Sequence, residues 1–189
     1  MLFDTKEVKI ATSEKQKSKG AGIETHIVSS LEIGMQKKDL ENAISLIQKN
    51  HAISFATKGA WSAHHLLEYL LRQIGSCEVI LASWAFSEQA AKTVQALKEQ
   101  GFIKKLTCYL DNRISVNAPK AKTILERAGE IHLISSHSKM ILLKNEEWFV
   151  TVVMSANFSA NRRLETGVIL TEEKNHAFFK KALESAIKK

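Results

Sequence analysis

An alternation of strand-like and helix-like segments runs through the middle of the sequence and limits the folds that the chain can adopt. Apolar runs at 78–84, 106–110 and 131–134 have the length of buried strands. Ser87 can cap a helix after the first run, and Pro119 can open a helix after the second. This alternation predicts parallel strands covered by helices, which is an α/β arrangement.

The last third of the sequence has a different pattern. Two continuous apolar runs, 139–143 and 148–154, are separated by a few polar residues. A short polar connection between such runs predicts a β-hairpin whose strands are buried on both faces. A polar loop is expected at 157–164, a strand at 167–170 and a final helix at 176–188. The predicted fold class is α/β, with a mixed β-sheet flanked by helices and an antiparallel C-terminal half.

The first part of the chain is harder to interpret. Residues 1–36 contain scattered lysines and a glycine-rich break, which is typical of a short strand or arm with a mobile loop. Apolar residues at helical spacing predict a helix at 38–50, followed by a strand at 51–56 and a second helix at 62–74. We therefore expect an N-terminal extension of unclear structure over residues 1–36 and one α/β domain over residues 37–189.

The charge balance favours a polyanionic partner. The chain carries 27 Lys and Arg against 20 Asp and Glu, a formal net charge of +7. Such an excess of positive charge is compatible with binding to DNA or RNA. Two adjacent arginines, Arg162 and Arg163, could bind a phosphate backbone, although a solvated pair is the plainer interpretation. The two cysteines, Cys77 and Cys108, lie in apolar contexts without nearby zinc-ligand spacing, and we expect two buried thiols.

No segment of the sequence suggests a membrane protein. The longest apolar runs contain only a few residues, whereas a bilayer-spanning helix needs about 20. The first residues also lack a charged start followed by an apolar segment, so no secretory signal is evident. We therefore expect a cytoplasmic protein that does not insert into membranes.

Polar residues gather at the two ends of the predicted hairpin that meet when it folds. His137 and Lys139 stand at the start of its first strand, and Ser155 and Asn157 stand at the end of its second. Residues i and i+2 of a strand point to the same side, so each pair should face one side together. Folding would then place an imidazole, an ammonium, a hydroxyl and a carboxamide around one pocket.

This set of groups suits phosphoryl transfer at a phosphodiester. A histidine such as His137 can attack phosphorus and form a phosphoryl-enzyme intermediate. Lys139 would supply positive charge to the non-bridging oxygens, while Ser155 and Asn157 would add directed hydrogen bonds. Glu165, which lies ahead of the next strand, could accept the imidazole proton and fix the tautomer of the ring. This chemistry requires neither a metal nor another cofactor.

These residues resemble one half of the phospholipase D superfamily signature. That signature reads His-x-Lys, four residues, Asp, about six residues, Gly-Ser-x-Asn and a later Glu. The matching positions are His137-Ser138-Lys139, Ser155-Ala156-Asn157 and Glu165. The upstream run 79–87, its following helix and the run 106–111 also resemble the first strand–helix–strand unit of the family.

The resemblance covers roughly residues 76–172 and has two departures. Lys144 stands where the family has its Asp, and Met154 stands where the family has the Gly before Ser. The family Asp usually stabilises local structure, and a side chain in place of Gly would narrow the approach to the pocket. The loss of the Asp favours a degenerate site, and the Met in place of Gly either restricts the substrate or marks such a site.

The resemblance also implies a quaternary arrangement. The family mechanism uses two motifs, with one histidine as nucleophile and the other as general acid, and this chain carries one motif. A homodimer with the two copies of His137 at its twofold axis would complete the site. The implied function is metal-independent hydrolysis of phosphodiesters, most readily a nuclease acting through a phosphohistidine. Two alternatives stay open: a degenerate member that binds nucleic acid without cleaving it, and a structural α/β protein with an accidental pocket.

Overall fold

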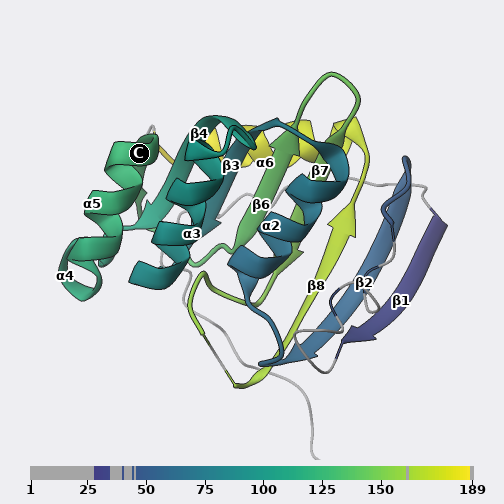
Figure 1. Ribbon diagram of the computed structural model, residues 1–189, viewed down its shortest axis with the longest axis horizontal. Helices are drawn as coiled ribbons and strands as arrows, with labels where there is room; N and C mark the ends of the chain where they lie inside the picture. The colour runs from purple at the N-terminus through teal and green to yellow at the C-terminus, as the bar shows by residue number, and fades with distance from the viewer. Residues whose placement is uncertain (1–27, 35–39, 41–43, 45, 161, 188–189) are drawn as a thin grey trace, which may run out of the picture.

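The computed structural model describes residues 28–34, 40, 44, 46–160 and 162–187 (Figure 1). Within this part of the chain, eight strands form one sheet in the order β1-β2-β8-β7-β6-β3-β4-β5. The strands are β1 (Val28–Gly34), β2 (His51–Lys58), β3 (Cys77–Ser83), β4 (Ile103–Asp111), β5 (Glu130–Ile134), β6 (Met140–Lys144), β7 (Phe149–Met154) and β8 (Leu164–Leu170). The helices are α2 (Ala63–Ile74), α3 (Glu88–Glu99), α4 (Ile114–Asn117), α5 (Pro119–Ala128) and α6 (Glu173–Ser185).

The sheet is mixed, as the sequence predicts. Strands β3, β4 and β5 are parallel neighbours, each reached through the helices between them. Strands β6 and β7 form the predicted antiparallel hairpin, and β8 continues the antiparallel half toward β2. Most β6 and β7 residues are buried because helices cover both faces of the sheet there.

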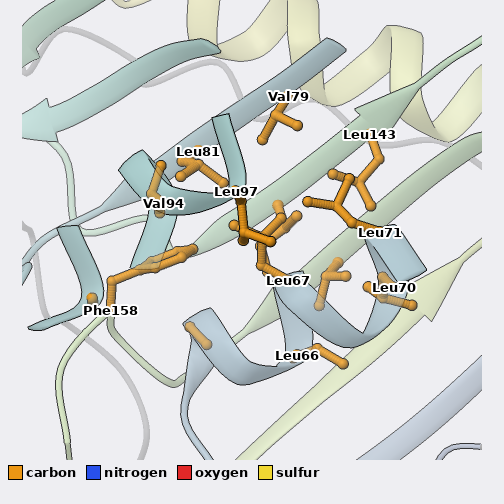
Figure 2. Packing of buried hydrophobic residues seen from close by; sticks show 14 of the residues in the cluster. Leu66, Leu67, Leu70, Leu71, Val79, Leu81, Val94, Leu97, Leu143 and Phe158 are labelled. Carbon is orange, nitrogen blue, oxygen red and sulfur yellow. The ribbon is translucent and has the colours of Figure 1, made fainter. Parts of the chain in front are cut away.

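Helices α2, α3 and α5 cover one face of the sheet, and α6 lies on the opposite face (Figure 1). The main core lies beneath α2 and α3, where apolar side chains of the helices meet those of β3 and β6 (Figure 2). Four leucines of α2 recur at helical spacing and are fully buried, and they pack with Val79, Leu81, Val94, Leu97 and Leu143. The leucines are Leu66, Leu67, Leu70 and Leu71. A smaller cluster anchors α6 through Leu183 and Leu142.

Two predicted helix starts are confirmed. The Ser87 side chain accepts a hydrogen bond of 3.2 Å from the Ala90 backbone N–H and caps α3. Pro119 occupies the first turn of α5. These caps fix where each helix starts relative to the preceding strand end, which is the edge where the polar residues gather.

Several predicted boundaries are wrong. The helix expected at 38–50 does not reach Asn50, because residues 46–50 form an irregular segment and a turn; residues 38–39, 41–43 and 45 lie outside the described part. Strand β8 starts at Leu164, so the loop before it is shorter than expected. Helix α6 spans Glu173–Ser185 rather than 176–188, and the short helix α4 was not predicted.

Part of the predicted N-terminal extension belongs to the sheet. Strand β1 pairs in parallel with β2 at the edge of the sheet, from Val28 opposite His51 to Gly34 opposite Thr57. The remainder of residues 1–36 lies outside the described residues. Among the helices that the structure describes, none has the length and apolar character needed to cross a bilayer.

Candidate active site

Strand ends from both halves of the sheet meet along one edge, which we call the carboxyl edge. The parallel strands β3, β4 and β5 end there. Strand β6 begins there because Met140 pairs with Ala82, and β7 returns to it because Val153 pairs with Met140. Strand β8 begins at the same edge, where Gly167 pairs with Met154. The edge therefore brings together segments that are far apart in the sequence.

His137 and Lys139 lie together at this edge, as predicted. Lys139 Nζ is 2.9 Å from His137 Nδ1 and donates a 2.7 Å hydrogen bond to the His137 carbonyl oxygen. His137 is exposed, whereas Lys139 is only 7% exposed. An ammonium can only donate, so the bonded ring nitrogen of His137 acts as the acceptor. The pair thus combines a solvent-facing imidazole with a buried cation.

Burial gives the Lys139 ammonium unusual properties. Desolvation lowers the pKa of Lys139, while the negative charge of Glu165 acts in the opposite direction. The nearby carboxylate thus partly compensates for the burial of the ammonium. A cation that is desolvated beside an open imidazole can interact strongly with a bound anion.

Ser155 and Glu165 form a second pair at the edge. Ser155 Oγ donates to Glu165 Oε2 and accepts a 3.0 Å hydrogen bond from the Thr166 backbone N–H. The Ser155 backbone N–H in turn donates to the Thr166 carbonyl at 2.9 Å. These bonds attach the segment after β7 to the start of β8, and they fix the position of the Glu165 carboxylate.

Asn157 joins the segment after β7 to the end of β3. Its Oδ1 accepts hydrogen bonds from the Ala85 backbone N–H at 3.2 Å and from Ser83 Oγ at 3.4 Å. Next to it, the Phe158 and Phe86 rings stack with centroids 4.6 Å apart. The Asn157 oxygen therefore has a structural role, which leaves the amide NH2 as the group suited to contact a ligand.

The predicted geometry differs in one respect. The four residues 137, 139, 155 and 157 lie outside the strands, so the i, i+2 alternation does not set their directions. His137 and Lys139 are bonded to each other, but Ser155 and Asn157 bond to different strands. The structure thus brings the residues to one edge by the meeting of strand ends rather than by strand pleating.

The two predicted arginines lie just before β8. Arg162 and Arg163 are both exposed. Arg162 lines a surface pocket of about 290 Å³ together with Trp61 and His65. Since β2 also ends at this edge, with Lys58 opposite Leu164, the pocket adjoins the carboxyl edge.

Neither departure from the family signature adds a charge at the edge. Lys144 lies at the other end of β6, opposite Glu78 in the register of β6 and β3. Its ammonium lies over the Phe149 ring, 5.4 Å from the ring centroid. Met154 is 7% exposed and belongs to the core. The position of the missing Asp is therefore at the opposite end of β6 from the site residues.

Sequence reasoning missed three residues beside His137. The Trp84 ring lies against the His137 ring, with centroids 5.4 Å apart. Arg113 lies over the Trp84 ring, 4.7 Å from its centroid, and is bonded to Asp111. Trp84 is the last residue of one predicted strand and Asp111 follows another, and these positions at strand ends were the available signal. Among the described residues, no three His, Cys, Asp or Glu side chains are grouped closely enough to hold a metal.

Comparison with known proteins bears on the fold. No protein-family model matches the sequence, and no curated protein matches it. The crystal structure of Nuc from Salmonella typhimurium, a phospholipase D family member, superposes with a TM-score of 0.56 at 16% sequence identity. That match covers 71% of this chain and 92% of Nuc.

Polyphosphate kinase from Porphyromonas gingivalis superposes with a TM-score of 0.55 at 15% identity, over 78% of this chain. This chain spans only 28% of that kinase. At 15–16% sequence identity, the similarity to these two structures establishes the fold and not the activity. The arrangement of strands and helices matches that of Nuc over nearly its whole length, and the chain therefore has the phospholipase D superfamily fold.

Proposed function

We propose that the protein hydrolyses phosphodiester bonds in nucleic acid, without a metal, through a phosphohistidine formed on His137. The observation that carries this proposal is the contact between Lys139 Nζ and His137 Nδ1, at an edge that also holds Ser155, Asn157 and Glu165. A solvent-facing imidazole beside a buried cation is suited to attack on a phosphate, because the cation attracts the anion that the imidazole attacks.

The proposed reaction has two steps. His137 Nδ1 exchanges its hydrogen bond from Lys139 Nζ for a bond to phosphorus as the bond from phosphorus to the leaving oxygen breaks, and the leaving oxygen takes a proton from a second imidazole. Water then attacks phosphorus and gives a proton to that imidazole, and the phosphorus–nitrogen bond breaks. Both proton transfers need a histidine other than the nucleophile.

The other residues have distinct roles in this scheme. Lys139 stabilises the charge on the non-bridging oxygens, and the Asn157 amide NH2 donates to the phosphate. Glu165, fixed by Ser155 and the start of β8, balances the Lys139 charge and orients the His137 ring. Arg162 and Arg163, exposed before β8, contact phosphates outside the reacting group.

The second imidazole would come from another copy of the chain. The sequence holds a single His-x-Lys motif, so a twofold axis near His137 would supply the partner's His137. The proposed active form is therefore a homodimer with one composite site. Its net charge, +7 for each chain, favours a nucleic acid as the substrate.

The placement of the two departures supports hydrolysis over binding alone. The missing Asp and the added methionine are the features that favour a degenerate, non-cleaving protein. Because Lys144 lies at the other end of β6 and Met154 lies in the core, neither removes a group from the edge.

A cleavage assay tests the proposal. Wild-type protein should cut plasmid, single-stranded DNA or RNA in EDTA, and His137→Ala should lose this activity. A matched control is His132→Ala, since His132 lies on β5 beside Glu130 and away from the proposed chemistry. Binding of all three nucleic acids without any cleavage would overturn hydrolysis and favour the non-cleaving protein.

Cross-linking tests the dimer separately. Both native cysteines are buried, so a single introduced cysteine reports on surface proximity. Ser135→Cys, exposed and two residues from His137, should form an intermolecular disulfide rapidly under mild oxidation. Ser185→Cys, exposed at the end of α6, should not. An active protein that sediments as a monomer would contradict the composite site.

A further inference from the structure

Trp84, Asp111 and Arg113 form a cluster beside His137 that the proposed chemistry does not use. We call it the Trp84 cluster. Arg113 Nε donates to Asp111 Oδ1 at 2.7 Å, and the Arg113 backbone N–H donates to the same oxygen at 3.1 Å. The guanidinium lies over the Trp84 ring, and the Trp84 ring lies against the His137 ring. The cluster therefore connects an arginine to the proposed nucleophile.

The cluster is asymmetric in its exposure. The Asp111 side chain is 7% exposed, whereas the Arg113 side chain is 59% exposed. Hydrogen bonds from Arg113 lower the pKa of Asp111, and a backbone bond from Ser136 acts in the same direction. The Asp111 carboxylate is thus buried and holds the arginine in place, while the Arg113 guanidinium is open to solvent.

Stability alone does not account for this arrangement. The Asp111 carboxylate also accepts a hydrogen bond from the Arg113 backbone N–H, so it does not depend on the guanidinium alone. The Arg113 side chain donates to Asp111 mainly through Nε, and one of its terminal nitrogens makes a longer contact of 3.5 Å with the carboxylate. In the described part of the chain, the other terminal nitrogen has no hydrogen bond to protein. A guanidinium held in this way keeps donors for an anion and loses little freedom on binding it.

We propose that Arg113, held by Asp111 across the face of Trp84, binds a phosphate next to the one that His137 attacks. The substrate is then a strand with several phosphodiesters rather than an isolated diester. This inference rests on the proposed function and deepens it, because it assigns a second phosphate site on the β4 side of His137. Arg162 and Arg163 lie on the β8 side, so the reacting phosphate would have a cation on each side.

The surface beyond Arg113 has room for a strand to continue. A pocket of about 400 Å³ opens there between the starts of α3 and α5, lined by residues that include Phe86, Asn117 and Lys120. Lys120 is exposed, and the other charged residue of the lining, Glu88, is already paired with Lys92. Phe86 belongs to the stacked pair that closes the turn after β3, so the pocket adjoins the carboxyl edge.

Binding measurements test this inference without relying on cleavage. Fluorescence anisotropy would follow a labelled single-stranded oligonucleotide bound to His137→Ala protein, with and without Arg113→Gln. Loss of one charged hydrogen-bonding contact should weaken binding about tenfold or more. The dependence of log affinity on log salt should also become shallower by about one phosphate contact. Arg127→Gln, the same charge change at an exposed position of α5, should leave affinity and slope nearly unchanged.

Cleavage measurements then separate strand binding from chemistry. The ratio of kcat/KM for the oligonucleotide to that for bis(4-nitrophenyl) phosphate should fall about tenfold in Arg113→Gln. Equal losses on both substrates, or an unchanged salt slope, would overturn the second phosphate site. If wild-type protein cleaves neither substrate, hydrolysis fails, but a normal Arg113 effect on oligonucleotide binding would still support the site.

A fold control completes the test. Arg113→Gln and Arg127→Gln should unfold at the same temperature within a few degrees, because both side chains are largely exposed. If Arg113→Gln unfolds much earlier, Arg113→Lys provides a second variant. Lysine keeps the charge but not the planar fork, so it should restore part of the salt slope and little of the affinity.

Discussion

Met154 and Gly167 lie directly opposite each other on β7 and β8, and the glycine provides the space that the methionine fills. A Cβ atom at position 167 would lie 2.8 Å from Met154 Cβ and 2.4 Å from Phe55 Cζ. The family signature has glycine at the position of Met154. In this chain the Met154 side chain fits because Gly167, opposite it on β8, has no side chain.

Gly167→Ala should therefore be strongly destabilising. The new methyl group would meet Phe55, Met154 and the Val153 carbonyl, and overpacking of a close-packed core costs about 1–3 kcal/mol. Urea unfolding should show this loss. Thr166→Ala, at an exposed neighbouring position, is the matched control and should change stability far less. Equal stability for Gly167→Ala and wild type would show that the core relaxes around the methyl group.

Lys139→Met should abolish turnover while leaving stability unchanged or improved. Lys139 lies next to a strand end but is only 7% exposed. Burial lowers the pKa of Lys139, which means that the folded protein disfavours its charge. Methionine removes this desolvation cost and fills a similar volume.

The control for this variant is Lys144→Met, at the exposed far end of the same strand. It should retain turnover. Measured kcat and melting temperature together decide the role of Lys139. Large destabilisation of Lys139→Met with activity retained would identify it as a structural residue.

The strands and helices were largely predictable because the signals for them lie within each segment of the sequence. The runs that form β3, β6 and β7 are apolar and bounded by polar residues, and Ser87 and Pro119 mark helix starts by their own chemistry. Helix α4 was missed because four residues carry no readable periodicity. Residues 46–50 were expected to be helical but form an irregular segment and a turn, because spacing alone does not set the end of a helix.

The candidate site was predictable only as a set of residues. The motif order pointed to His137 and Lys139, and these two do lie together. Their surroundings depend on which strand ends meet, which requires the order of strands in the sheet. The Trp84 cluster illustrates this dependence, because Trp84 and Arg113 are separated by a helix and a strand, yet Arg113 lies over the Trp84 ring and that ring lies against His137.

Substitutions at Asn157 should separate its structural oxygen from its amide donor. Asn157→Asp keeps an oxygen that can accept from Ala85 N–H and Ser83 Oγ, so stability should change little. Turnover should fall strongly because the NH2 donor is replaced by a negative charge near the phosphate. Asn157→Ala should lose turnover and also about 1 kcal/mol or more of stability. If Asn157→Asp retains full turnover, the amide is not a phosphate donor.

His176 should make the protein sensitive to acid. Burial, assisted by Lys144 and Lys180, lowers the pKa of His176 from 6.5 to about 4. Between these values the unfolded chain binds more protons than the folded one, so stability is complete above pH 6.5 and falls toward pH 4. The loss is at most about 3 kcal/mol, from the size of the pKa shift.

His176→Gln cannot take up this proton and should flatten the decline. Urea unfolding at pH 7, 5.5 and 4.5 measures it in both proteins. The edge contact between the His176 and Phe149 rings is lost in the variant, so its stability at pH 7 serves as the reference for each curve. Parallel curves for the two proteins would assign the acid sensitivity to other groups.

His137 should carry the phosphoryl group during turnover. Its ring is exposed, held by Lys139 and backed by Trp84, so an incoming phosphate can reach a ring nitrogen. His137→Ala should lower kcat by several orders of magnitude. Protein denatured in alkali during turnover, where a phosphoramidate survives, should carry phosphate on a peptide that contains His137. Substantial cleavage by His137→Ala would show that phosphorus is attacked by some other group.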